Sequence, residues 1–177
     1  STDRNLEKSI MYTVGSVVIF VVCGFAVYRW QNGEHTRAAI NLLIVAMVGV
    51  CLLLGRIERF NGVVLRLFGI IVSGGSLSSA LLVSTNGLLW ALLALIQNVL
   101  TLSRRWALCL NAIIIVVLAS ATHLYDSAIH LVSWVTVAIL TTAFSLTSMN
   151  QLRAQREQLK TQANLDPLTG AGNRRLM

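Results

Sequence analysis

Long apolar runs, separated by short groups of charged and polar residues, dominate this chain. Six of them are on the scale of a membrane-spanning helix, which takes roughly 20 apolar residues. The predicted helices cover Ile10–Tyr28, Ala38–Leu54, Leu67–Val83, Gly87–Leu102, Trp106–Ala121 and Ile129–Met149. The pattern predicts an all-α membrane protein whose residues 1–149 form a six-transmembrane-helix bundle.

The third and fourth runs follow each other without an intervening charge, because no charged residue lies between Arg66 and Arg104. That stretch is too long for one crossing of the bilayer and just long enough for two. The residues from Ser84 to Gly87 predict the turn, since small polar residues and glycine release a helix. We expect a tight hairpin here. A re-entrant pair is the alternative, and either one leaves both chain ends on the same side.

Composition and charge agree with a membrane protein. The chain is 55% hydrophobic and only 12% charged, with a net charge of +7. A positive charge of this size invites a nucleic-acid interpretation. However, the lysines and arginines stand in short groups between apolar runs and form no basic stripe, so we expect no nucleic-acid partner. The expected partner is the lipid bilayer.

The cationic residues predict the orientation, because cytoplasmic loops are enriched in lysine and arginine. With a cytoplasmic N-terminus, the cytoplasmic segments hold Arg4, Lys8, Arg56, Arg59, Arg66, Arg104, Arg105, Arg153, Arg156, Lys160, Arg174 and Arg175. The external segments hold only Arg29 and Arg37. The bias appears only if the number of crossings is even, so both termini are predicted to be cytoplasmic.

Beyond Met149 the chain becomes polar. Residues 150–164 read NQLRAQREQLKTQAN, without glycine or proline, and are predicted to continue the last helix as a cytoplasmic signalling helix. Residues spaced alternately by three and four form a weak heptad, which predicts the seam of a short parallel coiled coil in a homodimer. The predicted seam consists of Met149, Leu152, Arg156, Leu159 and Ala163. A solvated single helix is the alternative.

The final segment, residues 165–177, begins a new unit. Pro167 is the only proline in the chain, and Asp166-Pro167 is followed by Thr-Gly and Gly-Asn steps that are typical of turns. The string LDPLTGAGNRR resembles the opening signature of GGDEF domains, D-x-L-T-G-L-x-N-R-R. The matching positions are Asp166, Leu168, Thr169, Gly170, Asn173, Arg174 and Arg175, whereas Ala171 stands where leucine is usual.

The resemblance implies a membrane-anchored diguanylate cyclase in the bacterial inner membrane. Two GGDEF domains of such a protein meet in a homodimer and condense two GTP molecules into cyclic di-GMP, with magnesium as the cofactor. The Gly-Gly-Asp/Glu-Glu-Phe loop does not occur in these 177 residues, so no catalytic or metal-binding residue is assigned to them. The membrane part would be a sensor module, truncated at the start of the GGDEF domain, that responds to an unknown small-molecule stimulus.

Two alternatives stay open. The sensor could be attached to a degenerate GGDEF domain or to a GGDEF–phosphodiesterase tandem. A small membrane transporter or channel is the alternative from another class. Against it, all seven acidic residues lie outside the predicted spans, whereas proton- and ion-coupled transporters commonly need carboxylates within the membrane.

Polar residues near and within the spans give the candidate sensor sites. His123, Asp126 and His130, together with His35 of the first external loop, could form an external ligand or pH-sensing site. The alternative is a polar loop at the membrane interface. Buried amides predict hydrogen bonds between helices, with a ligand cavity as the alternative. These amides are Asn41, Gln97, Asn98 and Asn111. The small residues from Gly69 to Ser79 predict close helix packing.

Overall fold

The computed structural model describes residues 2–57, 61–82 and 87–164. Within them, every regular element is a helix, which confirms the predicted all-α class. The elements are α1 (Thr2–Gln31), α2 (His35–Leu54), α3 (Asn61–Leu82), α4 (Gly87–Thr101), α5 (Arg104–Ser120), the short 3₁₀ helix η2 (Thr122–Leu124) and α6 (Ala128–Asn164). Each predicted span corresponds to one α-helix. Helices suit this sequence because they satisfy every backbone hydrogen bond internally in an apolar environment.

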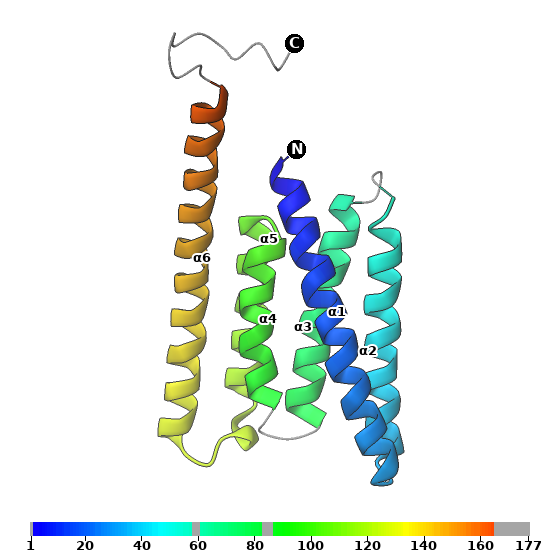
Figure 1. Ribbon diagram of the computed structural model, residues 1–177. Coiled ribbons are helices and arrows are strands. Elements are labelled where there is room, and N and C mark those ends of the chain that lie inside the picture. The colour runs from blue at the N-terminus through cyan, green and yellow to red at the C-terminus, as the bar shows by residue number, and fades with distance from the viewer. Residues whose placement is uncertain (1, 58–60, 83–86, 165–177) are drawn as a thin grey trace.

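The helices run alternately up and down in one bundle (Figure 1). The start of α1 and the end of α6 lie at the same end of the bundle, which we call the terminal end. The chain returns between α1 and α2 at the opposite end, where α6 also begins. The upper part of α6 projects past the other helices at the terminal end (Figure 1).

Four of the helices are long and apolar enough to cross a membrane. They are Leu6–Gln31 of α1, His35–Leu54, Gly62–Leu82 of α3 and Ala128–Leu159 of α6. By length and composition they mark the chain as a membrane protein. α4 and α5 are shorter, with 15 and 17 residues. Their lengths are roughly 22 and 26 Å, less than a hydrocarbon core.

α4 is enclosed by other helices. Nine of its fifteen residues are buried, and it contacts α1, α3, α5 and α6. At the start of α4, a Cβ atom on Gly87 would overlap the backbone of Ser79 and Ala80. Glycine therefore allows the backbones of α3 and α4 to touch, which is the close packing that the small residues of the third span predict. Residues 83–86, which hold most of the predicted turn, lie outside the described residues.

Two clusters of buried apolar side chains form the core. The terminal-end cluster draws on all six α-helices and consists of Met11, Val48, Cys51, Val64, Leu65, Phe68, Val99, Leu102, Ala107 and Met149. The opposite-end cluster consists of Ala80, Leu88, Ala91, Ala94, Leu95, Ile114, Leu118, Leu124, Trp134 and Ala138. Its members come from α3 to α6 and include none from α1 or α2. The first two helices thus share the core mainly at the terminal end.

Candidate functional site

A buried polar network joins four helices at mid-bundle. The side-chain amide of Asn98 on α4 donates to Ser73 Oγ on α3 at 3.0 Å and to Asn111 Oδ1 on α5 at 3.0 Å. Asn111 Nδ2 in turn donates to Thr142 Oγ1 on α6 at 3.2 Å and to the backbone oxygen of Leu95 at 3.1 Å. All four polar side chains are buried. The predicted role of Asn98 and Asn111 as hydrogen-bonding links between helices is confirmed.

This network orients α6 relative to the bundle. A hydrogen bond is directional, so Thr142 reaches Asn111 only when α6 has one particular rotation and height. Apolar contacts in a lipid environment discriminate less between registers, because lipid tails are as apolar as the side chains. The network therefore specifies the register of the helix that leaves the bundle at the terminal end.

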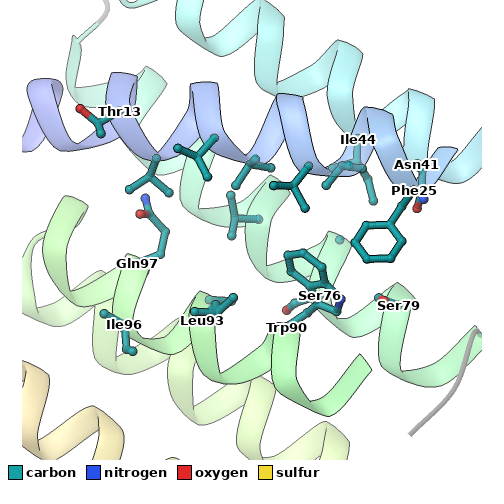
Figure 2. Close-up of a pocket in the computed structure, with 18 of the residues that line it drawn as sticks. Thr13, Phe25, Asn41, Ile44, Ser76, Ser79, Trp90, Leu93, Ile96 and Gln97 are labelled. Carbon is teal, nitrogen blue, oxygen red and sulfur yellow. The ribbon is translucent and has the colours of Figure 1, made fainter. Parts of the chain in front are cut away.

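The other two amides, Asn41 and Gln97, line a cavity rather than link helices. The cavity has a volume of about 480 Å³ and lies between α1 and α4, with α2 and α3 behind it (Figure 2). Its wall is mostly apolar. The lining residues are Thr13, Val14, Val17, Val18, Val21, Val22, Phe25, Arg29, Asn41, Ile44, Val72, Gly75, Ser76, Ser79, Trp90, Leu93, Ala94, Ile96, Gln97 and Leu100.

One end of the cavity carries aromatic and cationic groups. The rings of Phe25 on α1 and Trp90 on α4 meet edge to face, with centroids 5.8 Å apart and an interplanar angle of 84°. Arg29 Nη1 donates to Asn41 Oδ1 at 3.1 Å and so connects α1 to α2 at this end. Figure 2 shows Phe25, Asn41 and Trp90 together here and Thr13 far along α1 at the other end.

The cavity opens on the outer surface of the bundle between α1 and α4. Val17 on α1 and Leu93 on α4 both line it, and each is 57% exposed. On a membrane protein such side chains face lipid, so the mouth opens sideways into the bilayer. Sequence analysis missed this cavity, because it classed Arg29 only as an external charge and the valines of α1 only as parts of a span.

Gln97 combines a satisfied and an unsatisfied group. Its Nε2 donates to Thr101 Oγ1 at 3.0 Å, one turn along α4, and the Thr101 hydroxyl donates to the Gln97 backbone oxygen at 2.9 Å. The Oε1 atom is buried and has no hydrogen-bond partner among the described residues. A buried amide oxygen in this state costs roughly 1–3 kcal/mol. The side chain is therefore one that a change in the cavity can rearrange at low cost.

An ion pair ties the start of α1 to the projecting part of α6. Arg153 Nη2 lies 3.3 Å from Glu7 Oε1, and the two side chains are 34% and 16% exposed. The pair is shielded from water more than a surface pair, so it is worth more than the usual few tenths of a kilocalorie. α1 is thus connected both to the cavity and to α6.

The predicted seam residues have different surroundings on α6. Met149 is buried in the terminal-end cluster, which places it in the intramolecular core rather than on a free helix surface. Leu152 and Leu159 are 37% and 63% exposed, and Arg156 is half-buried. Ala163 lies within α6, but its side chain is outside the described part of the structure. The exposed apolar positions therefore begin at Leu152.

The external histidines and Asp126 fall into separate elements. His123 belongs to η2, Asp126 to the following bend and His130 to α6, so the three do not share one helical face. His130 Nδ1 lies 3.6 Å from Asp126 Oδ2, and Asp126 is almost fully exposed. The Tyr125 ring packs edge to face on His130, with centroids 5.5 Å apart. Its hydroxyl donates to the Leu118 carbonyl oxygen at 3.2 Å.

Burial raises the pKa of the Tyr125 hydroxyl, so this side chain remains a neutral donor. His35 lies in the α1–α2 connection, where it packs against Trp30 with ring centroids 4.7 Å apart. Across the ranges that the structure describes, no three His, Cys, Asp or Glu residues are placed to hold a metal ion. The external ligand or pH site stays a prediction that rests on the Asp126–His130 pair.

The signature segment stays a sequence-based prediction. Its matching positions, Asp166, Leu168, Thr169, Gly170, Asn173, Arg174 and Arg175, lie outside the described residues. Comparisons of the chain with protein-family models, with curated proteins and with solved structures give no match.

Proposed function

We propose that this chain is the membrane sensory and transduction module of a diguanylate cyclase. In this proposal all six α-helices cross a bacterial inner membrane, both ends are cytoplasmic, and a GGDEF domain starts at residue 165. The observation that carries it is α6, a single helix from Ala128 to Asn164 that leads directly into the signature-like segment. A signal received among the helices can reach the catalytic domain along this one rigid element.

The length of α6 supports a role in transmission. Its 37 residues correspond to roughly 55 Å, against roughly 30 Å for the hydrocarbon core. The helix therefore reaches from the external loop through the membrane and well into the cytoplasm. Arg153, bound to Glu7, marks the last contact with α1 that we describe. Beyond this point a rotation or shift of α6 would move the attached domain directly.

Six crossings follow from the alternating directions of the helices (Figure 1). α4 and α5 are short for a crossing, but α4 lies mostly inside the bundle. A helix sheltered by protein does not have to match the full thickness of the hydrocarbon, because its ends meet polar groups of neighbouring helices and snorkelling side chains. Arg66, whose guanidinium carbon lies 5.4 Å from the centroid of the Trp106 ring, is such a side chain at the terminal end.

The orientation can be tested with reporter fusions. Cationic residues gather near the terminal end, and only Arg29 and Arg37 belong to the opposite end. Fusions after Arg105 are expected to behave as cytoplasmic, and fusions at Asp126 as external. The reverse pattern would place the signature segment on the side of the membrane where GTP is absent, and would overturn the proposal.

Activity is tested on the full-length protein. The coding sequence after Met177 is expected to contain an intact Gly-Gly-Asp/Glu-Glu-Phe loop, and the protein in membranes is expected to form cyclic di-GMP from GTP and magnesium. The control is the same protein with the loop aspartate or glutamate replaced by alanine. An intact loop without product would contradict the proposal. A degenerate loop, or a following phosphodiesterase domain, would select the alternative sensor arrangement.

The cavity gives the transporter alternative a specific observation of its own. A transporter needs an intramembrane site that opens in turn to each side, whereas this cavity opens sideways between α1 and α4. Reconstituted liposomes separate the two functions. Protein-dependent movement of a solute across the liposome membrane would favour transport, and its absence together with cyclic di-GMP formation would favour the sensor.

A further inference from the structure

We propose that the cavity between α1 and α4 binds a single-chain amphiphile with an anionic headgroup. The headgroup is held by Arg29, and the chain lies along α1 towards Thr13. This inference deepens the proposed function by naming the class of stimulus, and only its signalling consequence rests on that function. Binding itself is a property of the described helices.

The shape of the cavity fits one chain. Its lining on α1 extends from Thr13 to Arg29, a distance of roughly 24 Å along the helix axis. A volume of about 480 Å³ spread over that length has a mean cross-section of roughly 20 Å². That is the width of one extended alkyl chain and not of two. The volume also lies within the range of roughly 300–1,000 Å³ that is typical of small-ligand sites.

The wall of the cavity is apolar along most of this length. Valines at positions 14, 17, 18, 21 and 22 provide the α1 side, and Leu93, Ala94 and Leu100 provide much of the α4 side. These residues offer dispersion contacts to methylene groups and no hydrogen bonds. Such a wall selects a hydrocarbon chain over a polar metabolite.

The charge of Arg29 selects the headgroup. Its recorded hydrogen bond is to a neutral amide, Asn41 Oδ1. In the described part of the chain, no carboxylate lies within ion-pair distance of Arg29. A guanidinium carries five N–H donors in a planar fork that matches carboxylate and phosphate oxygens. Arg29 is three residues from the end of α1, so an anion bound there would sit at headgroup depth with its chain towards the bilayer centre.

The route of entry agrees with this ligand class. The mouth lies between exposed apolar residues that face lipid, including Val17 and Leu93. An amphiphile in the external leaflet already has its chain in the hydrocarbon and its headgroup at the interface. It can therefore slide in sideways without crossing water or turning over.

Occupation of the cavity would act on α1. Apart from the cavity end formed by Phe25 and Trp90, a chain would separate α1 from α4 over several turns. α1 is also paired through Glu7 with Arg153 of α6. A bound chain would thus stabilise one position of α1 and bias the register of α6.

The binding test uses Trp90, because this indole lines the cavity. The full-length protein is placed in nanodiscs of phosphatidylcholine at alkaline pH, where a fatty acid is ionised, and titrated with brominated palmitate. Bromine quenches nearby indoles. The expected result is a saturable loss of fluorescence that unlabelled palmitate reverses and that Trp90→Phe lacks. Equal saturable quenching in Trp90→Phe would overturn the site.

The charge is tested with Arg29→Gln, with Arg37→Gln as the matched control. Arg37 is an arginine in the neighbouring helix that pairs with Glu34 at 3.1 Å and does not line the cavity. We expect Arg29→Gln to weaken palmitate binding about tenfold, which corresponds to about 1.4 kcal/mol, and to leave the brominated C16 alcohol unaffected. Arg37→Gln should bind like the wild type. Arg29→Lys should restore most of the affinity for palmitate.

The outcomes are distinct. Equal affinity for palmitate and for the alcohol, or equal palmitate affinity in wild type and Arg29→Gln, would overturn the headgroup assignment. Failure of Arg29→Lys to restore binding would do the same if Arg29→Gln had lost the alcohol as well through misfolding. Competition by palmitate or by a lysophosphatidic acid decides whether the anion is a carboxylate or a phosphate. Because no GTP is present, a protein without cyclase activity can still pass this test.

Discussion

The mid-bundle polar network makes a quantitative prediction for Asn111→Ala. The substitution removes three hydrogen bonds of the Asn111 side chain, one from Asn98, one to Thr142 and one to the Leu95 carbonyl. Hydrogen bonds between membrane helices are worth about 0.6 kcal/mol each on average. Together they correspond to a loss of about 2 kcal/mol in the free energy of unfolding, because the pocket left behind also forfeits packing contacts.

A double-mutant cycle with Asn98→Ala isolates the bond between the two amides. The expected coupling energy is about 0.6 kcal/mol and at most about 1.7 kcal/mol. The assay is reversible unfolding in mixed micelles with increasing denaturing detergent, followed by far-ultraviolet circular dichroism. Ser120→Ala is the control, because Ser120 is exposed and its hydroxyl bonds only the Val117 carbonyl of its own helix among the described residues.

The reasoning would be refuted if Asn111→Ala cost no more than Ser120→Ala. It would also be refuted if the cycle gave no coupling between Asn98 and Asn111. Either result would mean that the four helices are held by apolar packing alone, and that α6 has no register specified by hydrogen bonding.

Three further predictions concern other contacts. Gly87→Ala should lower the free energy of unfolding by about 1–3 kcal/mol, because its methyl group would overlap the α3 backbone. In the same assay Gly24→Ala, with nothing within 4 Å, should stay within about 0.5 kcal/mol of wild type. Glu7→Gln should cost about 1 kcal/mol and change the cyclic di-GMP output of the full-length protein; unchanged stability and output would argue against a coupling of α1 to α6. A cysteine at exposed Leu152 should crosslink between two copies in intact membranes, whereas one at buried Met149 should not; crosslinking at neither position would contradict the paired-helix arrangement.

Much of the fold was predictable from the pattern of residues along the chain. Apolar runs between charges identified all six α-helices to within a few residues at most ends. This works because a helix in lipid satisfies its own backbone, so its existence depends on local sequence. The start of α1 was less predictable, since Thr2 to Ser9 is polar and its helical state depends on continuation from the apolar part. Four helices have the length and hydropathy of a span, and the crossing of α4 and α5 remains a proposal.

The partners of individual side chains were less predictable. Sequence marked Asn98 and Asn111 as amides in need of hydrogen bonds, and Asn41 and Gln97 looked the same. Only the relative rotation and height of the helices decided that the first two meet Ser73 and Thr142, while the other two line a cavity.

By itself, the sequence determined that this is an all-helical membrane protein and raised the resemblance to the start of a GGDEF domain. Both depend on residues that are neighbours along the chain. The tertiary structure decided that Arg29 borders an apolar cavity, that Glu7 meets Arg153, and that Met149 is buried. These facts depend on how separate helices dock, and a periodicity of one helix carries no information about the register of the next.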